Sequence, residues 1–280
     1  MTAPEIRRAR PLLGTFVEIV ARSDDQTAAA RAMSRAFAEI EMLQARLSAH
    51  DPASEVSRLN REAHERPVAV SRDTWHVLRT ACRLSRQSAG AFDVTLEGAS
   101  QHMRFLAGMR VHFARALRID LGGIAKGYCV DRAVASLRRG GIASGLVNAG
   151  GDVRAFGPCA FPLHVRHPND PRRVFSLGEI RDAALATSAS YATGCARCAG
   201  LLRDGRSGAP IAPGLSVSVR ASSALLADAL TKVLAAAGAQ AEPLLAHYGA
   251  HAWVYSAQAG GKPSPAMWGA DWEAPCAAAA

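Results

Sequence analysis

The stretch DLGGIAKGY, residues 120–128, decides the fold that we expect for this chain. The apolar residues 117–121 predict a buried strand, and the amphipathic pattern after the stretch predicts a helix. Between these elements the chain places a carboxylate at Asp120, two glycines and then Lys126. Because free N–H groups and the helix dipole favour an anion at a helix start, the turn suits a phosphate group. An ordinary strand–turn–helix with Lys126 in solvent has the same pattern, so the stretch alone leaves both interpretations open.

The use of lysine supports the phosphate interpretation. The chain has 33 basic residues, of which only Lys126, Lys232 and Lys262 are lysines. A chain that otherwise uses arginine places a lysine in this turn, as expected where a compact ammonium group is needed.

The composition predicts a globular protein in the cytoplasm. Of the 280 residues, 49% are hydrophobic and 20% are charged, as in ordinary folded domains. No apolar run reaches the roughly 18 residues that span a bilayer, so we expect no membrane insertion. The first ten residues carry three arginines but lack the apolar core and cleavage site of a signal peptide.

The six cysteines are too widely spread for a disulfide framework, which fits a reducing compartment. Cys195 and Cys198 form a CxxC pair. A zinc site would need a second ligand pair, and no matching CxxC or HxxxH follows. The pattern therefore favours a loop over a metal or redox site.

The net charge of +9 suggests an anionic partner. The arginines are scattered along the sequence without a stripe interleaved with aromatic residues, and only 6% of the residues are aromatic. We therefore expect no nucleic-acid partner, and favour attraction for an anionic small molecule.

Helical and strand patterns are mixed irregularly, which predicts an α+β fold rather than a doubly wound sheet. Asp25 and Ser71 are typical N-caps, and a later helix is expected from Ser222 or Ser223 to Gly238. Strand patterns cover residues 12–21, 145–147, 153–156, 163–166, 185–188 and 215–219, and a loop pattern covers residues 48–60. We expect one domain over residues 1–245 and a largely irregular C-terminal extension over residues 246–280, because Ala, Gly and Pro dominate from Ser256 onward.

The helix that contains Asp228, Thr231 and Lys232 has two interpretations. These residues are spaced i, i+3 and i+4, so they share the face opposite the apolar one. They form either a solvent face with a weak Asp228–Lys232 pair, or a site at which Asp228 and Thr231 give oxygen ligands to Mg²⁺.

Seven motifs occur in the order found in one known family. They are LGT (13–15), the segment from SE to N (54–60), GAFDVT (90–95), the segment from DLGG to VD (120–131), NAGGD (148–152), ATS (186–188) and ADAL (227–230). Together they resemble the ApbE family, the FAD:protein FMN transferases, over roughly residues 10–240. The segment 120–132 and NAGGD are the most specific of them.

The resemblance implies an α+β fold with mixed or antiparallel sheets that binds FAD and Mg²⁺. The family splits FAD at its diphosphate, transfers FMN to a threonine hydroxyl of an acceptor protein and releases AMP, with the metal neutralising phosphate charge. Carried onto this chain, the resemblance places these residues at the flavin nucleotide: Leu13, His50, Ala91, Phe92, Asp93, Asp120, Lys126 and Leu201. It places the metal on a backbone carbonyl near Gly123 and on Asp228 and Thr231.

Three positions depart from the family's usual pattern. His50 stands where a tyrosine usually stacks on the flavin, and Leu201 stands where a His-x-x-Asp-Pro segment usually begins. Lys232 stands where a threonine is usual as a metal ligand; a protonated lysine cannot be a ligand, but it can supply positive charge there. The sequence therefore leaves two functions open, an FMN transferase and a non-catalytic or altered FAD-binding relative.

Overall fold

The burial pattern of the strands shows why the main sheet is covered on both faces. The computed structural model describes residues 3–167, 170–190, 202–256 and 264–268. In β2 (Thr15–Arg22), Val17 and Ile19 belong to one apolar cluster, whereas Val20 belongs to another on the opposite face. Because successive side chains of a strand point to opposite faces, a strand that is apolar on both must be buried on both.

Within the described residues, eight strands form the main sheet, in the order β1-β2-β6-β7-β10-β11-β12-β13. Every neighbouring pair is antiparallel. The other seven strands are β1 (Glu5–Leu12), β6 (Ser144–Ala149), β7 (Asp152–Phe156), β10 (Ala184–Ser190), β11 (Leu215–Ala221), β12 (His251–Ser256) and β13 (Ser264–Trp268).

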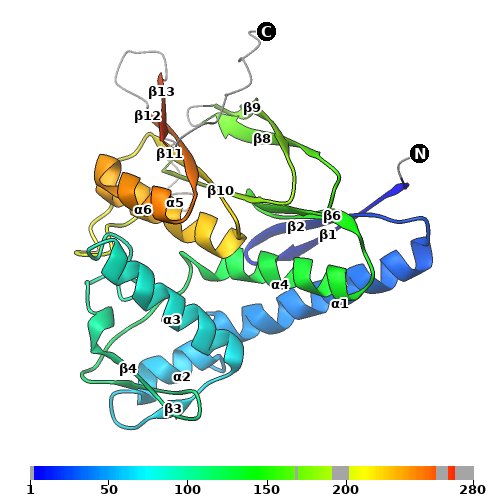
Figure 1. Ribbon diagram of the computed structural model, residues 1–280. Helices are drawn as coiled ribbons and strands as arrows, with labels where there is room; N and C mark the ends of the chain where they lie inside the picture. Colours follow the sequence, from blue (N-terminus) through cyan, green and yellow to red (C-terminus); the bar gives the residue numbers. More distant parts are fainter. Residues whose placement is uncertain (1–2, 168–169, 191–201, 257–263, 269–280) are drawn as a thin grey trace.

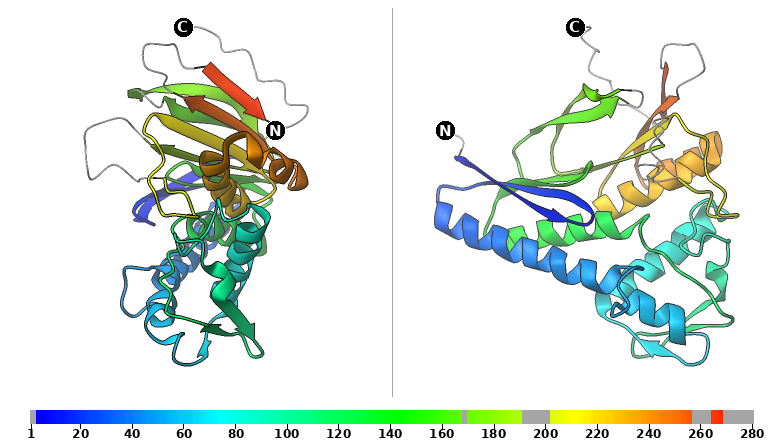
Figure 2. Two further views of the ribbon diagram at one scale, coloured as in Figure 1. Left: turned by 90° about the vertical axis from the view of Figure 1, so that its left-hand side faces the viewer. Right: turned by 180° about the vertical axis from the view of Figure 1, so that it is seen from behind.

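Helices α1 (Gln26–Leu47), α4 (Ala125–Arg139) and α5 (Ala224–Ala237) lie on one face of this sheet. The hairpin of β8 (Phe161–His167) and β9 (Asp170–Ile180) covers the other face, as the views from the side and from behind also show (Figures 1 and 2). After α5 the chain continues through a short 3₁₀ helix, η2 (Gly238–Ala241), into α6 (Glu242–His247). The fold is thus α+β with antiparallel sheets, which confirms the fold class expected from the sequence.

The stretch 224–247 has the length and apolar composition of a membrane-spanning helix, contrary to the expectation that no apolar run is long enough. Its most apolar window is 56% buried inside the protein, and η2 interrupts its α-helical path. These properties are equally those of a core helix in a globular domain.

A smaller unit packs against one end of α1, away from the main sheet (Figure 1). It contains α2 (Glu55–Glu62), α3 (Arg72–Gln87), the 3₁₀ helix η1 (Ser100–His102) and a small antiparallel sheet of β3 (Val68–Ala69), β5 (Arg110–Phe113) and β4 (Met103–Leu106). The predicted N-caps are confirmed: the Ala28 N–H donates to Asp25 (2.8 Å), and the Thr74 N–H donates to Ser71 (3.3 Å). The prediction of a loop over residues 48–60 is wrong in part, because α2 begins within this range. Ser54 caps α2 by accepting the Ser57 N–H.

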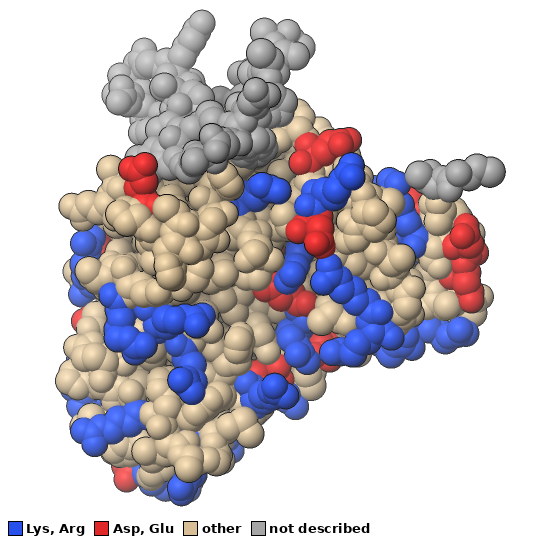
Figure 3. Space-filling model, viewed as in Figure 1, with Lys and Arg blue, Asp and Glu red and all other residues tan. Residues whose placement is uncertain are grey.

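The arginines are less scattered than the sequence suggests. Arg72, Arg79, Arg83 and Arg86 are exposed on one side of α3, at spacings that place them on one helix face. Figure 3 shows basic side chains gathered over this helix. Arg79 also lies over the Trp75 ring, 6.0 Å from its centroid.

Two further sequence predictions are wrong. Residues 117–121 form no strand; Ile119 instead exchanges two hydrogen bonds with the Asn60 side chain (2.8 and 3.0 Å), and the Asp120 N–H donates to the Val94 carbonyl. Residues 12–21 are not one strand, because Leu13 and Gly14 both have positive φ (56° and 70°) and form the two-residue turn between β1 and β2.

The C-terminal extension is not wholly irregular. Residues 251–256 pair with β11 as β12, and residues 264–268 pair with β12 as β13. The HAWVYS segment alternates along its length, with Ala252 in one apolar cluster and Trp253 in the other. Residues 252–255 are all apolar, and a short apolar run of this kind is typical of a strand that is buried on both faces, so the signal was present in the sequence.

Helices α4 and α5 cap each other. Asp131 of α4 accepts the N–H groups of Ala224 (2.9 Å) and Leu225 (3.0 Å) at the start of α5. In return, Asp228 of α5 accepts the Gly127 N–H (3.1 Å) at the start of α4. The two N-terminal turns are thereby held together by a carboxylate from each helix.

Replacing Asp131 with Ala tests this capping. The change removes both acceptors at the start of α5 and the ion-pair partner of Arg154, whose side chain is 20% exposed. We expect the free energy of unfolding, measured by denaturant titration, to fall by about 3 kcal/mol. The control variant Glu97→Ala breaks the exposed Glu97–Arg115 pair. It should change the free energy of unfolding by less than about 0.5 kcal/mol. Equal losses in the two variants would contradict a capping role for Asp131.

Candidate functional site

Two cavities meet at the turn of residues 120–128. The first, which we call the Phe92 cavity, has a volume of about 420 Å³. It is lined by Ala91–Leu96 (except Thr95), the turn, β10, residues 202, 203 and 205, and Lys232. The second, the His50 cavity, has a volume of about 350 Å³ and is lined by Leu13, Gly14, the end of α1, His50 and the turn. Asp120, Gly122 and Lys126 line both cavities. The turn, with Lys126, is therefore part of the wall of both cavities.

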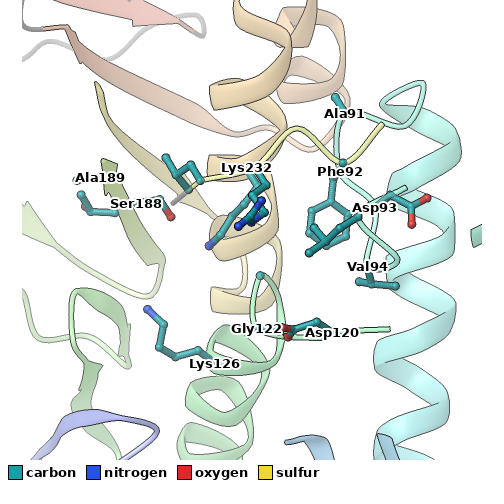
Figure 4. A pocket seen from close by; sticks show the side chains of 16 residues that line it. Ala91, Phe92, Asp93, Val94, Asp120, Gly122, Lys126, Ser188, Ala189 and Lys232 are labelled. Carbon is teal, nitrogen blue, oxygen red and sulfur yellow. Dashed lines mark hydrogen bonds between the residues drawn. The ribbon is translucent and has the colours of Figure 1, made fainter. Parts of the chain in front are cut away.

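The loop after α3 forms one wall of the Phe92 cavity. Phe92 is 4% exposed, and a Cβ added at Gly123 would lie 3.3 Å from its ring. The Asp93 carboxylate accepts hydrogen bonds from Thr95 and Ser85 (2.6 and 2.8 Å for the two hydroxyls) and points away from the cavity in Figure 4. Asp93 thus holds the loop together, whereas Ala91 and Phe92 face the cavity.

The remaining predicted binding residues lie around the turn. Asp120 is exposed, and its carboxylate accepts the Gly122 N–H (2.8 Å), which fixes the turn. Leu13 and His50 lie on the His50 cavity, and the Leu13 N–H donates to the Gln44 side chain. The predicted contact at Leu201, and the CxxC pair of Cys195 and Cys198, lie outside the described residues.

Lys126, which lines both cavities, forms an ion pair with a buried carboxylate. Its ammonium nitrogen lies 2.6 Å from Oδ2 of Asp152, which is only 1% exposed. Burial, reinforced by the nearby Asp228 carboxylate, raises the pKa of Asp152 to about 6. Burial alone would lower the pKa of Lys126, but Asp152 and Asp228 raise it above its ordinary value.

Lys232 forms a second buried pair beside the first. Its ammonium nitrogen contacts Oδ1 of Asp228 and donates to the Asp228 carbonyl oxygen at 3.0 Å. Asp228 and Thr231 are both 0% exposed, so the solvent-face interpretation of this helix is wrong. We call the four groups Asp152, Asp228, Lys126 and Lys232 the charge cluster, because the other three all influence the pKa of Asp152. The two lysines line the Phe92 cavity (Figure 4).

The N–H groups at the start of α4 are partly used by the protein itself. The Gly127 N–H, which the sequence offers to a phosphate, donates to Asp228 instead. A Cβ at Gly127 would lie 2.2 Å from the Ala224 carbonyl oxygen, so only glycine allows α4 and α5 to approach this closely. The positive groups that line the Phe92 cavity are side chains, those of Lys126, Lys232 and Arg203, rather than this N–H.

Sequence reasoning missed part of the cavity wall. Leu202, Arg203 and Gly205 line the Phe92 cavity, and a Cβ at Gly205 would lie 2.3 Å from the Asp93 nitrogen. The close approach of Gly205 to the loop is what requires glycine at this position. No pattern in the sequence marks Leu202 or Arg203.

A sequence profile of the ApbE family matches residues 13–112 and 102–254, which is most of the chain. The chain belongs to the ApbE family. The FAD:protein FMN transferase of Vibrio cholerae is 25% identical over 224 residues, which cover 68% of this chain and 67% of that protein. The chain thus spans about two thirds of the length of such curated relatives.

Solved structures of this family share the fold. The apo form of the flavinyl transferase ApbE from Pseudomonas stutzeri superposes with a TM-score of 0.82 at 25% identity, covering 95% of each chain. The ApbE protein from Thermotoga maritima superposes with a TM-score of 0.77 at 26% identity, covering 90% of this chain and 94% of that chain. This ApbE protein therefore has the family's fold over nearly its whole length.

Replacing Gly127 with Ala tests the close approach of α4 and α5. Gly→Ala within an unconstrained helix is stabilising by about 1 kcal/mol. Here the added methyl group would meet the Ala224 backbone, so we expect a loss of about 3 kcal/mol in the free energy of unfolding. Ala135→Gly, at a half-buried position of the same helix, should lose only about 1 kcal/mol. A stabilised Gly127→Ala protein would show that the helices are not in contact here.

Proposed function

We propose that this cytoplasmic ApbE protein binds FAD across the Phe92 and His50 cavities and transfers its FMN half to a threonine hydroxyl of an acceptor flavoprotein. The hydroxyl oxygen forms a bond to the phosphorus of the FMN half, and the bridging P–O bond of the diphosphate breaks. AMP leaves with the electron pair of that bond, and the hydroxyl proton passes to solvent. The two halves of FAD thus become a flavin phosphodiester and AMP.

One observation carries this proposal: the two cavities share Asp120, Gly122 and Lys126. A dinucleotide has two broad ends joined by a diphosphate, and two cavities with an ammonium group in their common wall match that shape and charge. The Phe92 ring and the His50 side chain, one in each cavity, offer apolar or stacking contacts. Phosphoryl transfer needs mainly positioning and positive charge, and the ammonium groups of Lys126 and Lys232 bring positive charge to the cavity wall.

The residues assigned to Mg²⁺ by the resemblance do not fit that ion as they are arranged here. Lys232 already holds Oδ1 and the carbonyl oxygen of Asp228, and Gly127 holds Oδ2. In the described part of the chain, no group of three or more His, Cys, Asp or Glu side chains could hold a metal either. The proposed transfer therefore includes no step that runs through a metal.

The second candidate function is an FAD-binding protein without transferase activity. The same Lys232–Asp228 contact favours it, because one ammonium group supplies less charge to a developing phosphate transition state than a divalent cation does. Both candidates need the same FAD site.

A transfer assay separates them. The purified protein is incubated with FAD and an acceptor flavoprotein domain that carries the target threonine, and covalent flavin fluorescence and released AMP are measured. We expect both products in equal amounts, and neither with the Lys126→Met variant. Tight FAD binding without AMP release would leave the non-catalytic function, whereas no FAD binding would exclude both.

The pKa of Asp152 predicts how FAD affinity depends on pH. At pH 7 the charge cluster sums to zero, with Lys126 and Lys232 balancing Asp152 and Asp228. Because the pKa of Asp152 is about 6, it gains a proton by pH 5 and the cluster becomes positive. FAD affinity, measured by flavin fluorescence, should therefore be roughly threefold to tenfold higher at pH 5 than at pH 7.

Asp152→Asn should remove this pH dependence of FAD affinity. If the variant keeps the pH dependence, Asp152 is not the titrating group.

The same pKa also makes the stability of the folded protein depend on pH. Folding raises the pKa of Asp152 from 3.8 to about 6. Its contribution to the free energy of unfolding is therefore full below about pH 4 and is lost as the pH rises through about 6.

A further inference from the structure

Lys232 reaches the charge cluster from within α5. It lies one helical turn after Asp228 and is 18% exposed, with its side chain lining the Phe92 cavity. A Cβ atom added at Gly123 would lie 3.7 Å from the Cε atom of Lys232. The ammonium group is thus held between Asp228 and the glycine turn.

The polar groups around Asp228 are already satisfied within the chain. Its carboxylate accepts from Gly127 and Lys232, and its carbonyl oxygen accepts from Lys232 and from the Thr231 hydroxyl (2.6 Å). The Thr231 hydroxyl also shares a hydrogen bond of 2.7 Å with Ser188. A Mg²⁺ ion would need these oxygens at about 2.1 Å in octahedral geometry, and would have to displace the ammonium group from them.

We propose that the Lys232 ammonium group takes the place of the divalent cation, so that this protein binds the diphosphate of FAD without a metal. The inference rests on the proposed FAD site. An ammonium group has three N–H donors; two are used on the oxygens of Asp228, which leaves one for a phosphate oxygen. Lys126, whose nearest anionic partner is Asp152, provides the second positive charge at the same wall of the cavity.

Asp228 has two roles in this arrangement. Its carboxylate holds the Lys232 side chain in place by direct contact, and at the same time it caps α4 through Gly127. The charge that meets the phosphates is consequently part of the folded chain. It should need no loading from solution and should not be removed by a chelator.

The test measures FAD binding by fluorescence titration, once with EDTA and once with Mg²⁺, for the wild type and three variants. The wild type should bind FAD with the same affinity, within about twofold, under both conditions. Lys232→Thr should bind FAD about tenfold more weakly in EDTA. Its affinity should recover with Mg²⁺, because the threonine hydroxyl offers an oxygen ligand and the loss of the ammonium group frees the oxygens of Asp228. Lys232→Met should be weak in both. Arg79→Thr, which removes an exposed charge on α3, should behave as the wild type.

A direct count of bound metal gives an independent readout. Mn²⁺ binding, followed by electron paramagnetic resonance in the presence of FAD, should be undetectable in the wild type and close to one ion per chain in Lys232→Thr. Circular dichroism and thermal unfolding check that the variants are folded; the wild-type comparison of EDTA with Mg²⁺ does not depend on any variant.

The possible failures can be told apart. FAD binding by the wild type only when Mg²⁺ is present, or stoichiometric Mn²⁺ binding by the wild type, would overturn the role of Lys232 while leaving the FAD site intact. Undiminished affinity of Lys232→Met in EDTA would also overturn it. A wild type that binds no FAD under either condition would instead overturn the proposed function itself.

Discussion

The contact between the first turns of α4 and α5 is the constraint on which the site depends. Each helix lends a carboxylate to the other: Asp131 caps α5, and Asp228 caps α4. The exchange is possible because Gly127 lets the Ala224 backbone come within a distance that any side chain would block. Both helix N-termini, which carry partial positive charge, are thereby fixed next to the turn of residues 120–128. Lys126 projects from the first turn of α4, and Lys232 lies one turn after Asp228 in α5, so the positions of the two ammonium groups follow from how the helices pack.

The elements that sequence predicts correctly are those specified by neighbouring residues. Asp25 and Ser71 mark helix starts because an N-cap bonds to an N–H group three residues ahead. Residues 117–121 are apolar enough for a strand, but whether a strand forms depends on a partner elsewhere in the chain. Asn60, 59 residues away, takes both backbone groups of Ile119 instead. The Leu13–Gly14 turn was missed for a related reason, since Leu at φ 56° is uncommon for a non-glycine residue and is imposed by the pairing of β1 with β2.

The site shows the same division between local and long-range information. The motifs identify Ala91, Phe92, Asp120 and Lys126, and the structure gathers all four around one cavity. The motifs cannot show that Asp93 turns inward to Thr95 and Ser85, because that depends on Ser85 in the preceding helix. Nor can they show that Asp152 and Asp228 lie near enough to influence each other. A carboxylate at position 152 and a lysine at position 232 become one electrostatic unit only when β7, α4 and α5 are packed together.

The choice of lysine over arginine at this unit has a physical basis. Of the 33 basic residues, two of the three lysines are in the charge cluster. A guanidinium group is planar and broad, and it pairs best side by side with a carboxylate. An ammonium group is small and directs three N–H donors around one point, so it can satisfy Asp228 and still approach a phosphate from within a buried helix. The same compactness makes it the one basic side chain that approximates a small metal ion in position, though with half the charge of Mg²⁺. If phosphoryl transfer at this site uses Lys232 in this way, the lower charge must be offset by positioning, which is what the rigid contact between α4 and α5 provides.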